Sequence, residues 1–339
     1  MFLKTVMERN QPLVRLGIDW QQNGVILPDT YLLDYDTILE NARSIKQAGD
    51  ANGVQNFFML KQIGRNPLIA RALTDMGYVG AVCVDFREAL TMVENQIPLG
   101  NVGHLVQIPR AALKKILRAK PVIVTVYTLE KAREISAVCT ELGLHQKLML
   151  RVLGEGDMLY SGQYGGFELQ ELDSTVRAIE AMPNVEVGGV CSFPCFLYDE
   201  AAQDILPMPN LRTVQTAAEM LRARGYRDLM LNTPSATCTH SIPMIAAAGG
   251  THGEPGHGLT GTTPYHAGHP DAEERPGYLY VSEVSHNLGD KAYCYGGGHY
   301  RRGHMKNALV GTTPENAKVV PVLPPDDSSI DYHFELQQN

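Results

Sequence analysis

The stretch Asn56-Phe57-Phe58-Met59-Leu60-Lys61, followed by Gln62-Ile63-Gly64-Arg65-Asn66-Pro67, is the part of the sequence around which the rest is organised. Four apolar residues lead into one lysine, and Gly64 and Pro67 end the element before a helical pattern begins. A short apolar run with two aromatic residues, bounded by turn residues, predicts a buried strand. We expect this strand to carry Lys61 at its C-terminal tip.

Lys61 has two interpretations. A lysine that loses its contact with water has a lowered pKa and becomes an amine nucleophile suited to forming a Schiff base. The structural alternative is a lysine whose aliphatic stem packs at the strand end while its ammonium group reaches solvent. The residues at the other strand ends are needed to choose between the two.

Composition restricts the classes of protein that fit. The 339 residues are 44% hydrophobic and 19% charged, which is ordinary for a globular protein. A net charge of −8 argues against nucleic acid or an anionic membrane as partner, because both attract positive surfaces. There is no apolar run of membrane-spanning length and no signal-peptide core at the start. The six cysteines form no CxxC pair, so we expect reduced, buried thiols in a cytoplasmic protein.

Strand-like and helical segments alternate along most of the chain. The expected strands are 32–35, 56–60, 80–84, 104–108, 122–127, 148–153, 185–193 and 229–233, with a possible extra strand near Gly250. The expected helices include 37–48, 87–95, 110–118, 129–142, 169–181 and 211–224. Alternation with apolar strands predicts a parallel sheet covered on both faces, and eight units have the size of a (β/α)8 TIM barrel. An open doubly wound sheet is the alternative, but no GxGxxG motif follows the first strand.

The pattern changes near residue 275. Short extended runs separated by Gly, Pro and Asp follow, with no segment of helix length between them. This predicts a smaller, mostly antiparallel β domain. We therefore expect an N-terminal arm at 1–28, a barrel at 29–275 and a β domain at 276–339. The chain ends soon after its last expected strand, so this domain is expected to be small or incomplete.

Functional residues of a parallel barrel lie at the C-terminal ends of its strands. Arg151 lies within an apolar strand and needs an anion, a polar ring substituent or a structural salt bridge. The segment Cys191-Ser192-Phe193-Pro194 follows another strand, and Ser235 and Thr237 follow a third. Hydroxyl groups in such a turn can donate hydrogen bonds to a phosphate.

The segment Gly249-Gly250-Thr251-His252-Gly253-Glu254-Pro255-Gly256-His257-Gly258 combines two histidines with a glutamate. It is not a metalloprotease site, because that motif needs histidines four apart on a helix and these are five apart across Gly and Pro. We interpret it as a tight turn whose backbone amides face an anion, with Glu254 nearby.

These residues resemble the fold-type III pyridoxal-phosphate enzymes, which include alanine racemases, ornithine and diaminopimelate decarboxylases, and D-threonine aldolases. The segment 33–41 is similar to the opening strand and helix of alanine racemase, and Lys61 falls where that family forms its Schiff base. Glu254-Pro255-Gly256-His257 resembles the Glu-Pro-Gly-Arg of the decarboxylases. Gly296-Gly297-Gly298-His299-Tyr300-Arg301 resembles a segment early in the racemase β domain, and with Ser285-His286 it is most similar to the YhfX-like group.

The resemblance implies pyridoxal 5'-phosphate (PLP) as cofactor and an amino acid as substrate. It also implies a homodimer, because in this fold the second domain of one subunit usually completes the other's site. The residues it assigns to the cofactor are Lys61 for the Schiff base, Glu254 at the ring nitrogen, Arg151 facing the ring 3-oxygen, Ser192 or Phe193 against the ring, Ser235, Thr237, Gly256 and His257 around the phosphate, and Tyr300 of the second domain.

The reaction is less constrained than the cofactor. The catalytic tyrosine of the racemase β domain has no counterpart here, and His286 is the nearest candidate for a second base beside Lys61. An amino-acid racemase is the leading hypothesis, and a decarboxylase is the runner-up. A metal-assisted aldolase or dehydratase would use His286, Cys294 and His299 as zinc ligands. A PLP carrier and a barrel that has lost the cofactor are non-catalytic alternatives. His266, His269 and His304 are expected to be surface residues.

Overall fold

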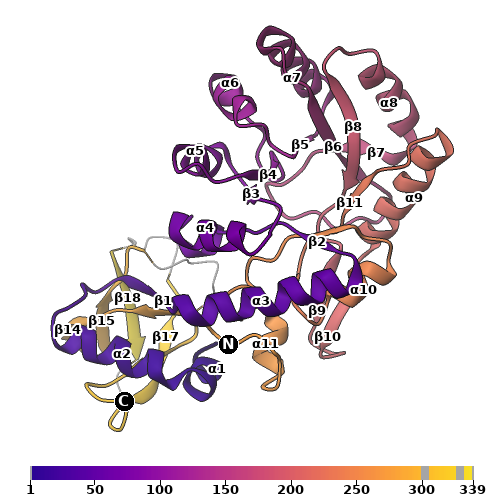
Figure 1. The fold of residues 1–339 in the computed structure, drawn as a ribbon. Helices are drawn as coiled ribbons and strands as arrows, with labels where there is room; N and C mark the ends of the chain where they lie inside the picture. Colours follow the sequence, from indigo (N-terminus) through magenta and orange to yellow (C-terminus); the bar gives the residue numbers. More distant parts are fainter. Residues whose placement is uncertain (1, 299–304, 326–331, 338–339) are drawn as a thin grey trace. The chain divides into compact units, whose positions relative to one another are not determined.

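The computed structural model describes residues 2–298, 305–325 and 332–337 (Figure 1). The chain divides into two compact units. The barrel unit is Leu39–Leu259, and the β unit combines Met1–Ile38 with Thr260–Asn339. In the described part of the chain, no helix is long and apolar enough to cross a membrane.

The barrel unit contains eight parallel strands in the order β2-β12-β11-β8-β6-β5-β4-β3. They are β2 (Gln55–Asn56), β3 (Ala81–Cys83), β4 (Leu99–Val102), β5 (Ile123–Val126), β6 (Gln146–Leu153), β8 (Val185–Cys191), β11 (Met230–Asn232) and β12 (His252–Gly253). The parallel bridge between Phe58 and Ala81 joins the two ends of this order. The sheet is therefore a closed (β/α)8 barrel, and the predicted fold class is confirmed.

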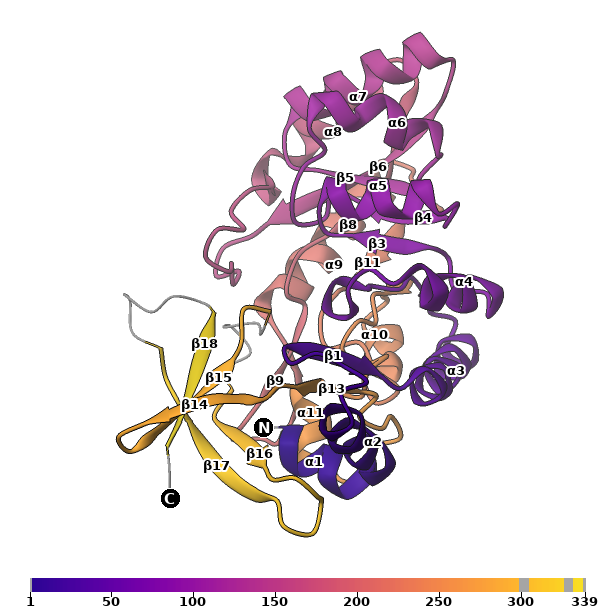
Figure 2. The same cartoon turned by 90° about the vertical axis from the view of Figure 1, so that its left-hand side faces the viewer.

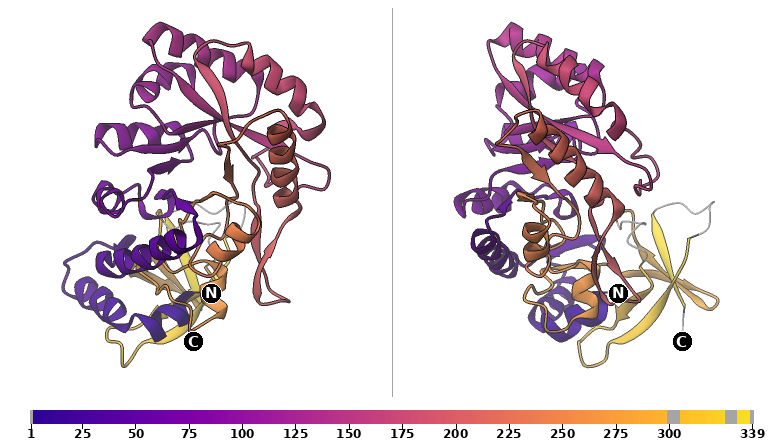
Figure 3. Two further views of the ribbon diagram at one scale, coloured as in Figure 1. Left: turned by 45° about the vertical axis from the view of Figure 1, so that its right-hand side comes forward. Right: turned by 90° about the vertical axis from the view of Figure 1, so that its right-hand side faces the viewer.

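Helices cover the outer side of these strands (Figures 1 and 3). They are α3 (Tyr35–Asn52), α4 (Pro67–Asp75), α5 (Phe86–Glu94), α6 (Arg110–Arg118), α7 (Leu129–Leu142), α8 (Leu172–Glu180), α9 (Pro209–Ala223) and α10 (Ile242–Ala247). Side-chain caps place several helix starts: Asn66, Asp85 and Thr128 each accept backbone N–H groups of the first turn. Additional elements are η1 (Lys61–Ile63), β7 (Phe167–Glu168) beside β6, η2 (Leu169–Glu171), and the antiparallel pair β9 (Phe196–Asp199) and β10 (Asp204–Pro207).

The barrel interior is apolar below its mouth. Phe57, Val82, Ile123, Met149 and Cys191 form one buried cluster contributed by five strand segments. Burying a side chain of this size stabilises the fold by about 1.5–3 kcal/mol. All six cysteines are free and buried, as predicted.

Two predicted barrel strands were wrong. The strand expected at 104–108 lies earlier, at Leu99–Val102. The strand contains Gly100, and a Cβ at this position would lie 2.4 Å from Cδ1 of Phe57, so the packing requires glycine in the strand. The segment expected at 32–35 is β1 (Thr30–Leu33), which pairs antiparallel with β13 (Tyr278–Val281) in the β unit. The extra strand near Gly250 is β12, which completes the eight.

The β unit holds a five-stranded antiparallel sheet in the order β14-β15-β18-β17-β16 (Figure 2). Its strands are β14 (Val284–Leu288), β15 (Lys291–Tyr295), β16 (Asn307–Val310), β17 (Lys318–Leu323) and β18 (His333–Gln337), and α11 (Pro264–Gly268) precedes them. The predicted antiparallel character is confirmed.

The N-terminal residues fold with the β unit, which differs from the expected separate arm at 1–28 and from a barrel domain beginning at 29. They form α1 (Phe2–Arg9) and α2 (Gln11–Gln22). Val6, Leu13, Val14 and Leu32 form a buried cluster against Leu279 of β13. Removing this apolar surface from water is the physical reason for the grouping.

Candidate active site

Glu254 directly follows β12 and carries a buried carboxylate at the C-terminal end of this strand. Its side chain is only 1% exposed. Oε1 accepts hydrogen bonds from Nδ2 of Asn232 at 2.6 Å and from Nδ2 of Asn101 at 3.3 Å. The Asn101 amide is itself oriented, because its Oδ1 accepts from the Thr125 hydroxyl at 2.7 Å. Oε2 has no hydrogen-bond partner among the described residues.

Three strands supply these contacts. Asn101 is on β4, Thr125 on β5 and Asn232 on β11, so barrel closure brings them to one carboxylate. Buried charges are otherwise costly, and hydrogen bonds from two amides offset part of that cost. These hydrogen bonds occupy Oε1 of Glu254 and leave Oε2 able to accept from a polar group outside this network.

His104 is a site residue that the sequence reasoning missed. It follows β4 directly after Gly103, has no exposed surface, and lies with Nε2 3.6 Å from Oε2 of Glu254. Both of its ring nitrogens lack a hydrogen-bond partner in the described part of the chain. Burial lowers the pKa of His104; the Glu254 charge opposes this shift, and the Arg151 and Lys61 charges add to it. A histidine directly after a glycine is the one sequence feature that could have indicated a loop residue here, but the apolar pattern predicts a strand at 104–108.

Arg151 lies on β6 and is fully buried, as expected. Nη1 donates to the hydroxyl of Tyr127 at 2.9 Å, and Nη2 donates to the carbonyl oxygen of Gln163 at 3.0 Å. Its guanidinium also lies 5.0 Å from the centre of the Tyr127 ring. Nε is buried without a partner, and no carboxylate forms an ion pair with Arg151 in the described residues. A structural salt bridge therefore does not account for this arginine.

Lys61 begins η1 at the end of the first barrel strand, and it is exposed. Of its two interpretations, a lysine without contact to water does not fit this exposure, and its role in a Schiff base stays a prediction. Its charge still acts on His104 and on Glu88. Arg65 adds a second cation, with Nη2 3.8 Å from Oδ2 of Asp85 and a buried Nε that has no partner among the described residues.

The two loops expected at a phosphate lie against each other. Oγ1 of Thr237 accepts from the backbone N–H of Glu254 at 3.3 Å, which ties the loop after β11 to the loop after β12. Ser235 and the next residue both have left-handed backbones, with φ of 105° and 53°. A Cβ at Gly256 would lie 2.9 Å from Nε2 of Gln62, so glycine permits this close approach. His257 is exposed.

Ser192 and Phe193 have different surroundings. The Ser192 hydroxyl accepts from Nδ2 of Asn210 at 3.0 Å and donates to Oδ2 of Asp157 at 3.4 Å. Phe193 is partly buried and packs edge-on against His104, with ring centres 5.4 Å apart. Phe193 thus lies beside the Glu254 pair, whereas the serine hydroxyl belongs to a separate polar network.

His286 is on β14 of the β unit and is exposed. Its ring stacks on Tyr293 of β15, with centres 4.8 Å apart and planes 5° apart, and Ser285 Oγ lies 2.9 Å from Nδ1. Its role as second base stays a prediction. Tyr300, His299 and His304 lie outside the described residues.

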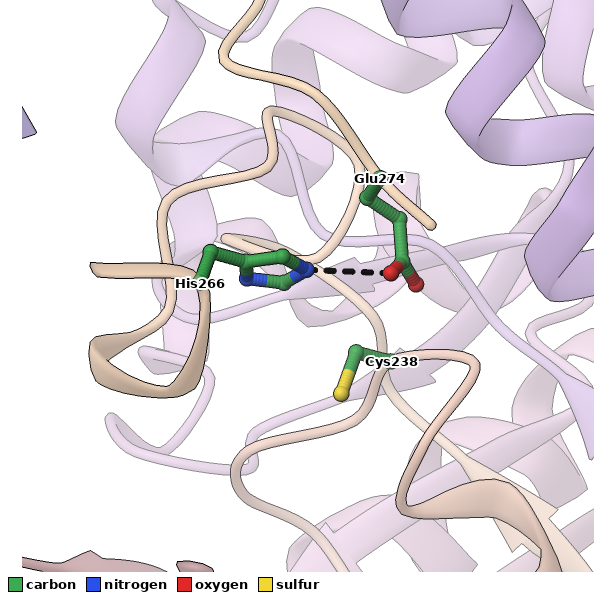
Figure 4. Close-up of side chains that lie close together, drawn as sticks. All are labelled: Cys238, His266 and Glu274. Carbon is green, nitrogen blue, oxygen red and sulfur yellow. Dashed lines mark hydrogen bonds and ion pairs between the residues drawn. The ribbon is translucent and has the colours of Figure 1, made fainter. Parts of the chain in front are cut away.

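His266 corrects the expectation of a surface histidine, since it has no exposed surface. Nε2 lies 3.0 Å from Oε2 of Glu274, a contact drawn in Figure 4. The backbone N–H of Thr263 donates to Nδ1 of His266, which leaves Nε2 as the donor to Glu274. This buried pair joins α11 to the segment that follows it. His269 is partly buried.

Comparison with known proteins agrees with this architecture. Residues 33–264 match the family model of the alanine racemase N-terminal domain, and residues 279–339 match that of the YhfX-like C-terminal domain. The chain is 42% identical over 338 residues to the uncharacterized protein YhfX of Escherichia coli (strain K12), covering 99% of this chain and 87% of that one. The chain belongs to the YhfX-like branch of the alanine racemase family. It is thereby a member of the fold-type III PLP enzyme class, as the sequence resemblance implied.

Solved structures show that this YhfX-like chain shares the fold of more distant enzymes. Alanine racemase from Streptomyces lavendulae has a TM-score of 0.66 at 17% identity, covering 93% of this chain and 85% of that one. Alanine racemase from Clostridium difficile 630 has a TM-score of 0.65 at 14% identity, covering 93% and 83%. D-Threonine aldolase from Filomicrobium marinum has a TM-score of 0.64 at 17% identity, covering 93% and 82%.

Proposed function

We propose that the barrel unit binds PLP covalently through Nζ of Lys61 and that the protein is an enzyme acting at the α-carbon of an amino acid, with racemisation as its reaction. The observation that carries the proposal is Glu254: a buried carboxylate, held by two asparagine amides, whose second oxygen has no hydrogen-bond partner among the described residues. It follows β12, which is the direct neighbour of the strand segment that ends at Lys61.

The residues at the mouth fit PLP by charge and by hydrogen-bonding capacity. Lys61, Arg65 and Arg151 bring three cations to the mouth of a chain whose net charge is −8, which favours an anionic phosphate ester there. Buried polar atoms without partners in the described residues include Arg151 Nε, Thr233 Oγ1, Glu254 Oε2 and both ring nitrogens of His104. Unpaired buried polar atoms are costly, and a polar ligand would satisfy them.

When bound, PLP supplies an electron sink for charge that develops at the substrate's α-carbon. Lys61 would hold the cofactor and exchange a proton at the α-carbon on one face. Glu254 would hold a proton at the pyridine nitrogen through Oε2. The loops at 235–237 and 254–257 would bind the phosphate, and Arg151 would bind the ring 3-oxygen.

Racemisation needs a second proton-transfer group, and we propose His286 for it. On this proposal the enzyme is a homodimer in which the β unit of one subunit completes the site of the other. Its partners are then an amino acid and a second copy of the chain.

Decarboxylation is the second candidate, because Glu254-Pro255-Gly256-His257 resembles the decarboxylase motif. The two reactions separate in one experiment, in which the PLP-loaded protein is incubated with single amino acids in deuterium oxide. Deuterium at the α-carbon with loss of optical rotation supports the racemase. Carbon dioxide release would replace it with the decarboxylase. Absence of both, for all amino acids, would refute the proposed function.

A further inference from the structure

His104 is the buried neighbour of Glu254, and the proposed function assigns it no role of its own. Oε1 of Glu254 is already occupied by two amide donors, so Oε2 is the oxygen left to face His104. Neither Oε2 of Glu254 nor Nε2 of His104 has a hydrogen-bond partner among the described residues, and 3.6 Å separates the two atoms. The two groups follow strands that are not neighbours, since His104 follows β4, Glu254 follows β12, and β3 and β2 lie between these strands in the closed sheet.

The chemistry of the two groups determines where the histidine proton lies. An ionised carboxylate only accepts hydrogen bonds, whereas a neutral imidazole donates through one nitrogen and accepts through the other. If Nε2 carried a lone pair, it would face the carboxylate oxygen in a buried environment, which is unfavourable. The N–H group therefore belongs on Nε2, and Nδ1 is left as an acceptor.

The charged groups around His104 determine whether its ring is neutral. Burial and the charges of Arg151 and Lys61 lower the pKa of His104, and only Glu254 raises it. Phe193 packs edge-on against the ring and offers no charge to stabilise an imidazolium. A neutral ring leaves the Glu254 charge uncancelled, whereas an imidazolium would neutralise it.

We propose that His104 is a positioning residue for Glu254: as a neutral imidazole protonated on Nε2, it directs its N–H group at Oε2, 3.6 Å away, and holds the carboxylate in place with its negative charge intact. The geometry of the pair stands without a cofactor. Only its consequence for PLP rests on the proposed function, because an intact negative charge is what a protonated pyridine nitrogen needs.

The first test uses PLP-free protein labelled with 15N in its histidine rings. Long-range 1H–15N spectra distinguish the two neutral tautomers and the imidazolium, and the His104 signals are those lost in His104→Gln. We expect a neutral ring with the proton on Nε2 between pH 6 and 8. In Glu254→Gln the pKa of His104 should fall further, because the anion that raises it is gone. A proton on Nδ1, or an imidazolium throughout this range, would overturn the proposal.

The second test measures PLP affinity by fluorescence titration. His104→Phe keeps an aromatic ring but removes the donor, and we expect affinity to fall about 10–100-fold. His104→Gln retains an amide donor and should stay within about threefold of the wild type. His145→Gln is the control, because His145 is exposed and lies near Glu186 on the outside of the barrel unit. Equal losses in the Phe and Gln variants would contradict a donor role. Failure of the wild type to bind PLP would instead count against the proposed function, and the ring spectra would still decide the assignment of His104.

Discussion

Replacing Glu254 separates its structural contribution from its electrostatic one. Glu254→Ala removes the acceptor of two buried amide donors, Nδ2 of Asn101 and Nδ2 of Asn232. Each buried donor left unsatisfied costs about 1–3 kcal/mol, so we expect a loss of about 2–6 kcal/mol in the free energy of unfolding. Glu254→Gln keeps a carbonyl oxygen for these donors and should lose about 1–2 kcal/mol.

Both variants lack the carboxylate, so the two should behave alike in catalysis. Removing one preorganised electrostatic group at a developing charge typically lowers the rate about 10²–10³-fold. The stability difference is measured by urea unfolding of PLP-free protein, and the rate by deuterium incorporation at the substrate's α-carbon. Covalent attachment of PLP to Lys61 should survive in both variants, because both retain this lysine.

Two results would refute this reasoning. An exchange rate of Glu254→Ala within threefold of the wild type would show that Glu254 does not face the pyridine nitrogen. Equal stability of the Ala and Gln variants would show that the two asparagine amides do not depend on this carboxylate.

Three further predictions concern other residues of the barrel unit. After borohydride reduction of the protein with PLP, peptide mapping should find the label on Lys61. Lys61→Ala should lose the label, and its free energy of unfolding should change by less than about 0.5 kcal/mol because Lys61 is exposed. Lys114→Ala is the control and should keep the label. Burial raises the pKa of Glu88 to about 7, so the folded state binds its proton more tightly than the unfolded state does. The contribution of Glu88 to the free energy of unfolding should therefore fall as pH rises from about 4.5 to 7, by about 3 kcal/mol at most. If the free energy of unfolding of Glu88→Gln varies with pH in parallel with that of the wild type, this prediction is contradicted. Gly100→Ala should lower the free energy of unfolding, measured in urea, by about 1–3 kcal/mol, because its Cβ would lie 2.4 Å from Phe57. Adding Phe57→Leu to this variant should recover part of the loss. If the effects of the two substitutions simply add, the clash is not the cause.

The site residues that the sequence predicted lie in short recognisable segments, whereas the site residues that it missed depend on contacts with distant parts of the chain. Lys61 and Arg151 were identified because each is a charged residue at the end of an apolar run or within one, and Glu254 because its glycine- and histidine-rich segment resembles a known motif; all three signals are visible within a few residues of sequence. Asn101 and His104 were missed because the strand was expected at 104–108, whereas it lies at Leu99–Val102 and contains Gly100. The reason for that glycine is the Phe57 side chain, 43 positions away in the sequence.

The alternation of apolar runs and amphipathic helices determined the barrel, because continuous apolar strands need cover on both faces and the helices supply it. The sequence also predicted that Lys61 lies at the end of the apolar run 57–60. Barrel closure decided the rest: it brought the amides of Asn101 on β4 and Asn232 on β11 to the carboxylate that follows β12, and it placed His104 beside the second oxygen of that carboxylate. The antiparallel pairing of β1 with β13, outside the barrel sheet, decided that residues 1–38 fold with the β unit. Which side chains become neighbours depends on which strands pair in the folded chain, and a local sequence pattern does not encode contacts between residues far apart in the sequence.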